Sequence, residues 1–201
     1  MKISVLKEPK QQRAKVKVEK ILLATKKLLM FHGVEKLTTN HIAEESGVTV
    51  GSIYQYFPNK QSILYKIYLD WLNEAKEQVI SFKELSKTMA PVELIRALFE
   101  EMYKGDDFDS EMHLLEVELI KVMGIYPELK EAEKQHGKEM ITLFSDTISQ
   151  ALPETSREKS VQLATFIYSI DSSISQFLEL GGSKELVFEW YEKVVMLTLD
   201  F

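Results

Sequence analysis

The stretch Thr38–Lys60, TTNHIAEESGVTVGSIYQYFPNK, decides the fold of this 201-residue chain. Thr38 and Thr39 are good N-cap residues, because their hydroxyls can accept from the free N–H groups of a following helical turn. Gly47 can take the left-handed conformation with which a short helix ends. The sequence therefore predicts one short amphipathic helix that closes at a glycine turn.

A second short helix follows the turn. Thr49 is placed to cap it, and the helix is expected to run from Val50 to about Phe57, with Ile53 on its apolar face. Asn59 then follows a proline and can cap a third helix. Two short helices joined at a tight glycine turn have the build of a helix-turn-helix, whose second helix enters the major groove of DNA.

The second helix carries the side chains that such contacts need. Gly51 removes bulk at the point of closest approach, Gln55 offers an amide to an adenine edge, and Lys60 offers a cation to the backbone. Hydroxyl donors come from Thr49, Ser52, Tyr54 and Tyr56. The competing interpretation is an ordinary helical hairpin, in which the glycine only caps a helix and the tyrosines are half-buried packing.

This stretch resembles the TetR family of bacterial transcriptional regulators. It is similar to the family's pattern T..IA..(A/S)GV(S/T).G.(I/L)Y.(Y/H)F..K..L at Thr39, Ile42, Ala43, Gly47, Val48, Thr49, Gly51, Tyr54, Tyr56, Phe57, Lys60 and Leu64. The resemblance implies phosphate contacts from Thr39, Thr49, Tyr54, Tyr56 and Lys60, and base proximity for Val50, Gly51 and Gln55. Thr38 and Ser52 complete the set of candidate DNA-binding residues. Val50 departs from the many relatives that carry a lysine or arginine there, so its readout is expected to be apolar, against a thymine methyl.

The charge of the chain is unevenly distributed. The net charge is −6, but residues 1–60 hold 11 Lys and Arg against 5 Asp and Glu, while residues 61–201 hold 14 against 26. The basic residues Lys10, Arg13, Lys15, Lys17 and Lys20 cluster before or within the first expected helix. A basic end on an acidic body suits phosphate binding at one end only.

Composition limits the remaining possibilities. The chain is 45% hydrophobic and has no cysteine, which excludes disulfides and thiolate metal sites. No segment reaches the roughly 18 to 20 apolar residues of a membrane span, and the amino terminus lacks an apolar signal core. We therefore expect a cytoplasmic protein without membrane contact.

Periodicity predicts an all-α fold of about nine helices in two domains. Residues 1–60 would form the DNA-binding domain, with a first helix over about 11–32, ended by Gly33, and the helix-turn-helix over 38–57. Residues 61–201 would form an effector-binding and dimerisation domain, entered through a connecting helix over about 61–82. Later helices are expected over about 91–103, 110–124, 127–152, 156–180 and 184–199, with Thr155 and Glu158 as a capping box for the fourth of these.

The last two helices, about 156–180 and 184–199, carry apolar residues on more than one side. Such surplus apolar surface predicts that two copies meet through these helices, although a fully buried core helix would show the same pattern. A homodimer would set two recognition helices in major grooves about one helical turn or more apart and so read a palindromic operator in double-stranded DNA.

The middle helices are expected to hold a small-molecule effector. Aromatic and methionine side chains suit an apolar or aromatic ligand, and three polar residues could orient it. The candidates are Phe99, Met102, Tyr103, Met112, His113, Glu116, Met123, Tyr126, Phe144, Phe166, Tyr168 and Asp171. The competing interpretation is that these side chains are plain core packing.

Other functions fit less well. No catalytic motif or cofactor signature occurs, and the four histidines are scattered. His113 and Glu116 could bind a metal only with further ligands. Asp107, Asp109, Glu111 and Glu118 match several positions of a calcium loop, but a methionine stands where that loop needs glycine. We therefore expect that the protein is not an enzyme and that it uses no cofactor and no metal. The first alternative is a helical ligand-binding or protein-interaction module without sequence-specific DNA binding. The second alternative is a metal-assisted enzyme.

Overall fold

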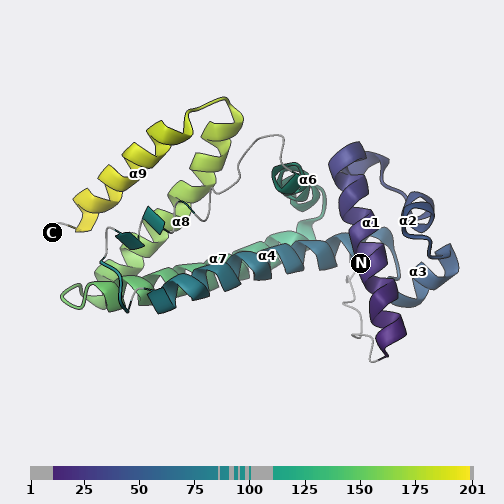
Figure 1. Cartoon of the computed structure of the whole chain (residues 1–201), viewed down its shortest axis with the longest axis horizontal. Helices are drawn as coiled ribbons and strands as arrows, with labels where there is room; N and C mark the ends of the chain where they lie inside the picture. The colour runs from purple at the N-terminus through teal and green to yellow at the C-terminus, as the bar shows by residue number, and fades with distance from the viewer. Residues whose placement is uncertain are drawn as a thin grey trace. The chain divides into compact units, whose positions relative to one another are not determined.

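The fold is all-helical in the part of the chain that the computed structural model describes (Figure 1). The described backbone comprises residues 11–85, 87–90, 93–94, 96–97, 100 and 111–199. For some of these residues the backbone is described but the side chain is not. They are residues 111–113, 171–172, 175–176, 178–179, 184, 188, 192 and 195–199. No helix among the described residues is both long enough and apolar enough to cross a membrane.

The expected helices are present wherever the chain is described. Their bounds are α1 (Gln12–Lys36), α2 (Thr39–Ser46), α3 (Val50–Tyr56), α4 (Lys60–Leu85), α6 (Glu111–Ile125), α7 (Pro127–Ala151), α8 (Arg157–Glu179) and α9 (Lys184–Leu199). The all-α prediction is confirmed, and these eight helices come close to the nine expected. The helix expected over about 91–103 falls largely outside the described residues.

One predicted cap is wrong. The sequence TSRE suggested that Thr155 and Glu158 cap the helix that begins near residue 156. In the structure the cap is Ser156, whose Oγ accepts from the backbone N–H of Lys159 at 3.3 Å. Serine and threonine are both good caps, so two adjacent candidates leave the register of the first turn undecided by one residue.

By contacts the chain divides into two compact units. The first contains the described residues of Met1–Leu72 and Asp107–Glu133, and the second those of Asn73–Asp106 and Lys134–Phe201. Two helices, α4 and α7, are shared between the units, since each runs through a boundary without a break.

The first unit is built around one hydrophobic core. Helices α1, α2, α3 and α6 and the beginning of α4 all contribute to it, and Ile53 and Phe57 are fully buried there. Tyr68 on α4 is also buried, and its hydroxyl donates to Glu133 Oε2 at 2.5 Å. Burial of side chains such as Ile53 fixes which side of α3 faces inward, because truncating one to alanine costs about 2–5 kcal/mol.

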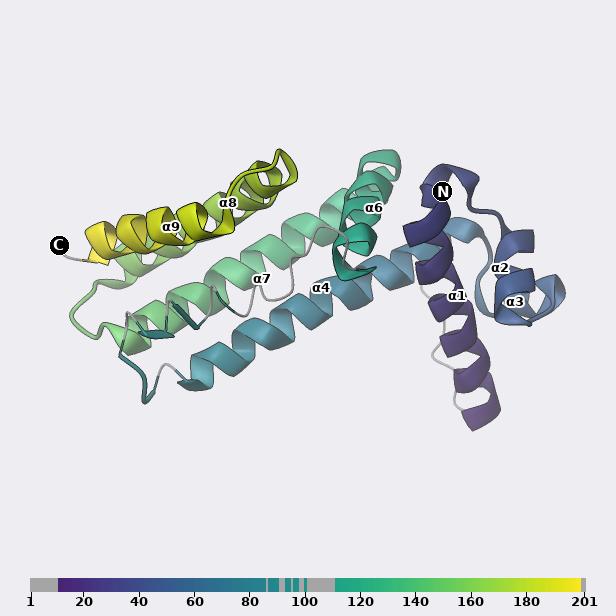
Figure 2. The same ribbon diagram turned by 45° about the horizontal axis from the view of Figure 1, so that its top comes forward.

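The second unit joins parts of α4, α7 and α8. A small apolar cluster of Val79, Met140, Phe144 and Ala164 packs there. Figures 1 and 2 show α8 and α9 running side by side after a tight turn, and the two helices are in contact.

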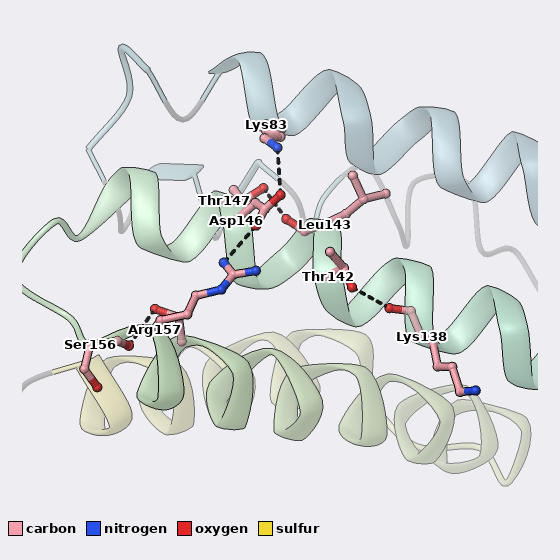
Figure 3. A network of polar contacts seen from close by, with 9 residues as sticks. Lys83, Lys138, Thr142, Leu143, Asp146, Thr147, Ser156 and Arg157 are labelled. Atoms are coloured by element: carbon pink, nitrogen blue, oxygen red, sulfur yellow. Dashed lines mark hydrogen bonds and ion pairs between the residues drawn. The ribbon is translucent and has the colours of Figure 1, made fainter.

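Charged side chains tie the helices of the second unit together. Asp146 on α7 accepts from Lys83 Nζ on α4 at 3.0 Å and from Arg157 on α8 at 2.8 Å (Figure 3). Desolvation by burial raises the pKa of the Asp146 carboxyl, but the hydrogen bonds from Lys83 and Arg157 outweigh it, so the net pKa is lowered. Asp146 therefore stays ionised and links three helices.

Candidate nucleic-acid interface

The helix-turn-helix has the predicted local geometry. The side chain of Thr38 accepts from the backbone N–H of His41 at 3.2 Å and so caps α2. Gly47 ends α2 with φ 64 and ψ 20, and no heavy atom beyond its chain neighbours lies within 4 Å of where its Cβ would be. The side chain of Thr49 then accepts from the backbone N–H of Ser52 at 3.3 Å and caps α3. The sequence interpretation of the turn is confirmed residue by residue.

Helix α3 has one buried and one exposed side. Ile53 on α3 and Phe57 at its C-cap are fully buried. Gly51, Tyr54 and Gln55 are exposed, and Tyr54 is 52% exposed despite its size. Figure 1 shows α2 and α3 close together beside α1. The exposed side of α3 is therefore available to a partner outside the unit.

The ten predicted DNA-binding residues differ in exposure. Five are exposed, namely Thr38, Thr49, Gly51, Tyr54 and Gln55. The other five are half-buried, namely Thr39, Val50, Ser52, Tyr56 and Lys60. Tyr56 packs against the core of the first unit. All ten lie within the short segment from the α2 cap to the first residue of α4, so the structure brings them together.

The basic side chains near this segment are exposed. Arg13, Lys15, Lys17 and Lys20 all lie on α1 and form no ion pair among the described residues, whereas Lys10 lies outside them. Lys27 differs, since its Nζ pairs with Glu45 Oε1 on α2 at 2.5 Å. The exposed cations of α1 are available for phosphate, while Lys27 joins α1 to α2.

Sequence reasoning missed two bonds to the backbone that leads into α2. We call residues 33–38 the connector. Glu118 Oε2 on α6 accepts from the backbone N–H of Val34 at 2.8 Å, and Lys60 Nζ on α4 donates to the carbonyl of Leu37 at 2.8 Å. The only signal in the sequence was Gly33, at which α1 is broken with φ 76 and ψ 163. A partner 84 residues away along the chain leaves no local pattern.

The predicted effector residues fall into separate places. Met123 and Tyr126 pack against the core of the first unit, where burial raises the pKa of Tyr126, and Glu116 is half-buried on α6. Phe144 and Tyr168 belong to the cluster of the second unit. Phe166 is 43% exposed.

The other effector candidates cannot be placed in full. Phe99, Met102 and Tyr103 lie outside the described residues. Met112, His113 and Asp171 lie on described helices, but their side chains lie outside the described set. Among the side chains that are described, no group of three or more His, Asp or Glu could hold a metal ion.

Comparison with known proteins agrees with this geometry. Residues 21–67, which extend from α1 through α2 and α3 into α4, match the sequence model described as "Bacterial regulatory proteins, tetR family". No curated protein matches the chain.

Solved structures match along most of the chain. A TetR-family transcriptional regulator from Mesorhizobium loti, itself described as putative, superposes with a TM-score of 0.77 at 16% identity, over 94% of this chain and 98% of that one. The multidrug binding protein EbrR, complexed with imidazole, gives 0.69 at 16% identity, over 90% and 94%. Reduced NemR from E. coli gives 0.69 at 16% identity, over 89% and 95%. At this identity the likeness establishes a common fold. Residues 21–67 therefore match the tetR-family model in sequence, and the chain shares its fold with these solved structures over most of its length.

Proposed function

We propose that this chain is a ligand-responsive repressor of transcription that binds a palindromic DNA operator as a homodimer. The observation that carries the proposal is the exposed side of α3, with Gly51, Tyr54 and Gln55 on a helix capped by Thr49. The family match supports the coarse function, a DNA-binding transcriptional regulator. The operator, the sign of regulation and the effector belong to the proposal.

In the proposed complex α3 lies in the major groove. Gly51 offers no side chain, so the helix backbone can approach the base edges closely. Gln55 would pair with adenine, and Val50 would contact a thymine methyl. Tyr54 and the exposed cations of α1 would bind phosphates, which carry affinity without sequence information.

The proposed dimer forms through α8 and α9. These helices and the turn between them leave large apolar side chains uncovered: Val161 (39% exposed), Phe166 (43%), Leu180 (83%), Leu186 (36%) and Trp190 (49%). Monomeric proteins rarely expose contiguous apolar patches of large area, and such patches typically mark interfaces. If α8 and α9 of two copies paired about a two-fold axis, the two α3 helices of the dimer would be held at a fixed distance from each other.

The proposed effector is an apolar or aromatic small molecule. Phe144 and Tyr168 supply aromatic surface in the second unit, and EbrR, which has the same fold, is described in complexes with imidazole and with malachite green. Functionally we assign residues 1–60 to DNA binding and 61–201 to effector binding and dimerisation. Helix α4 (Lys60–Leu85) links the two parts covalently, so a tilt of α4 would move the reading helix and release DNA.

The test is selection from random double-stranded DNA, followed by gel shifts at several salt concentrations. The proposal predicts an enriched palindrome and a binding constant that falls steeply with salt, because phosphate contacts release counterions. The alternative, a helical ligand-binding or protein-interaction module, predicts no enriched sequence. That outcome would overturn the proposal.

A further inference from the structure

The connector, residues 33–38, carries the chain from α1 into the helix-turn-helix. It begins at Gly33, whose left-handed φ of 76 breaks the regular helix, and it ends at Thr38, which caps α2. Val34 and Leu37 anchor it in the core, since each is at most 4% exposed. The path of this short segment therefore sets where α2 and α3 begin.

Glu118 on α6 holds the first half of the connector. Its side chain is only 12% exposed, and Oε2 accepts from the backbone N–H of Val34 at 2.8 Å. Oε1 accepts from Lys121 Nζ at 2.6 Å, which orients the carboxylate. A Cβ added at Gly33 would lie 3.4 Å from Oε2, so the carboxylate sits directly against the helix break. Bonds in which one partner is ionised are about twice as strong as neutral ones.

Lys60, at the start of α4, holds the second half. Its Nζ donates to the carbonyl of Leu37 at 2.8 Å in a half-buried setting. The connector thus has a backbone donor bound by a carboxylate and, three residues later, a backbone acceptor bound by an ammonium. Each bond is made to a main-chain group of the connector, so both side chains act directly on its backbone.

We propose that Glu118 is a positioning residue for DNA binding, which fixes the path of the connector and so the placement of α3. The inference rests on the proposed function, because it concerns how the proposed reading helix is held. Helix α6 is the element that supplies this bond, and it is followed after one residue by α7, which continues into the second unit. Glu118 matched a calcium-loop pattern in the sequence, but its carboxylate binds a backbone amide and a lysine instead.

The test compares Glu118→Ala with Glu118→Gln in the full-length chain. The amide oxygen of glutamine can still accept from Val34, whereas alanine cannot. Glu35→Gln is the matched control, because Glu35 is exposed, adjacent to Val34 and loses the same charge. Hydrogen exchange of the Val34 amide is read by NMR. The second readout is the spacing preference of each variant. A palindrome that the wild type selects is remade with its two half-sites one base pair closer together or further apart, and the affinities for these DNAs are compared.

In Glu118→Ala the Val34 amide is expected to exchange roughly tenfold faster. The ratio of affinities for the preferred and the altered half-site spacing should fall roughly tenfold. Non-specific DNA binding should keep its salt dependence. Glu118→Gln keeps a weaker, neutral bond and should lie between Glu118→Ala and wild type, at about threefold from wild type, whereas Glu35→Gln should stay within about twofold of wild type in both readouts. If the alanine variant does not fold, Glu118→Asp, which withdraws the carboxylate by one methylene, decides by the same two readouts.

Two results would overturn the inference while the proposed function stands. One is unchanged Val34 exchange and spacing preference in Glu118→Ala. The other is a uniform loss of affinity with a lower melting temperature but an unaltered spacing preference, which would make the bond merely structural. Failure of the wild type to select any palindrome would instead refute the proposed function itself.

Discussion

Replacing Gly51 by alanine should separate the stability of this protein from its DNA binding. Gly51 is the second residue of α3, its φ lies outside the left-handed region, and no heavy atom beyond its chain neighbours and the backbone of its own helix lies within 4 Å of where its Cβ would be. The fold itself therefore has no need of glycine at this position. The need, in the proposed function, comes from the close approach of α3 to base edges.

The two effects can be given magnitudes. A helical glycine costs roughly 0.5–1 kcal/mol relative to alanine, and a first-turn position belongs at the low end of that range. A gain of about 0.5 kcal/mol should raise the melting temperature by roughly 1–2 °C in a chain of this length. On DNA, one extra methyl in a closely packed contact costs about 1–3 kcal/mol. A cost of about 1.4 kcal/mol, in the lower part of that range, is about tenfold in affinity for each head and about a hundredfold for a two-headed complex.

Thermal unfolding and gel shifts on a selected palindrome measure the two effects. Gly47→Ala is the control for stability, because its site is equally open but its φ of 64 is left-handed. Alanine there should cost about 1–2 kcal/mol and lower the melting temperature. If Gly51→Ala kept DNA affinity within about twofold of wild type at equal salt, the close approach of α3 to bases would be refuted.

Three further predictions concern base readout, the dimer and pH. Gln55→Ala should lose about 1–3 kcal/mol of preference at one base pair, whereas Tyr54→Phe should weaken binding to all sequences alike. Binding measured on an array of single-base operator variants distinguishes these two effects. An equal loss of base preference in both variants would contradict the assigned roles. Trp190→Glu should raise the dimer dissociation constant by at least about thirtyfold in sedimentation, since the exposed indole would be a central interface anchor; an unaltered dimer would exclude this face. Asp146 has a lowered pKa, so its stabilisation should be present above its ordinary value of 3.8 and be lost as pH falls through the lowered value. The loss should stay below about 1 kcal/mol, because its carboxylate is 34% exposed, and Asp146→Asn should remove this part of the acid dependence in urea titrations.

Local features of the fold could be predicted from the sequence. The caps of α2 and α3 and the left-handed Gly47 follow from side-chain chemistry within four residues, and the structure has all of them. Asn59 likewise accepts from the Ser62 amide at 2.8 Å at the start of α4. These features depend on short-range hydrogen bonds and on backbone sterics, which a local pattern encodes.

Long-range features could not be predicted in the same way. The hydrogen bond between the Glu118 carboxylate and the Val34 amide joins residues 84 apart in the sequence. A glutamate on a helix can face solvent or bind any of many donors, so the sequence alone does not identify its partner. The expected effector residues illustrate a second limit. Tyr126 and Phe144 look alike in a helical pattern, yet they pack in different cores. Periodicity predicts that a side chain is buried, but not which side chains it meets.

Methylation interference on a selected palindrome tests the central claim most directly. Guanine N7 lies in the major groove and adenine N3 in the minor groove, so the modified base reports which groove the protein occupies. The account predicts interference at N7 positions in two segments related by a two-fold axis, about one helical turn or more apart, and these effects should weaken in Gly51→Ala. Interference confined to the minor groove, or to a single segment, would contradict a paired reader whose α3 helices enter the major groove.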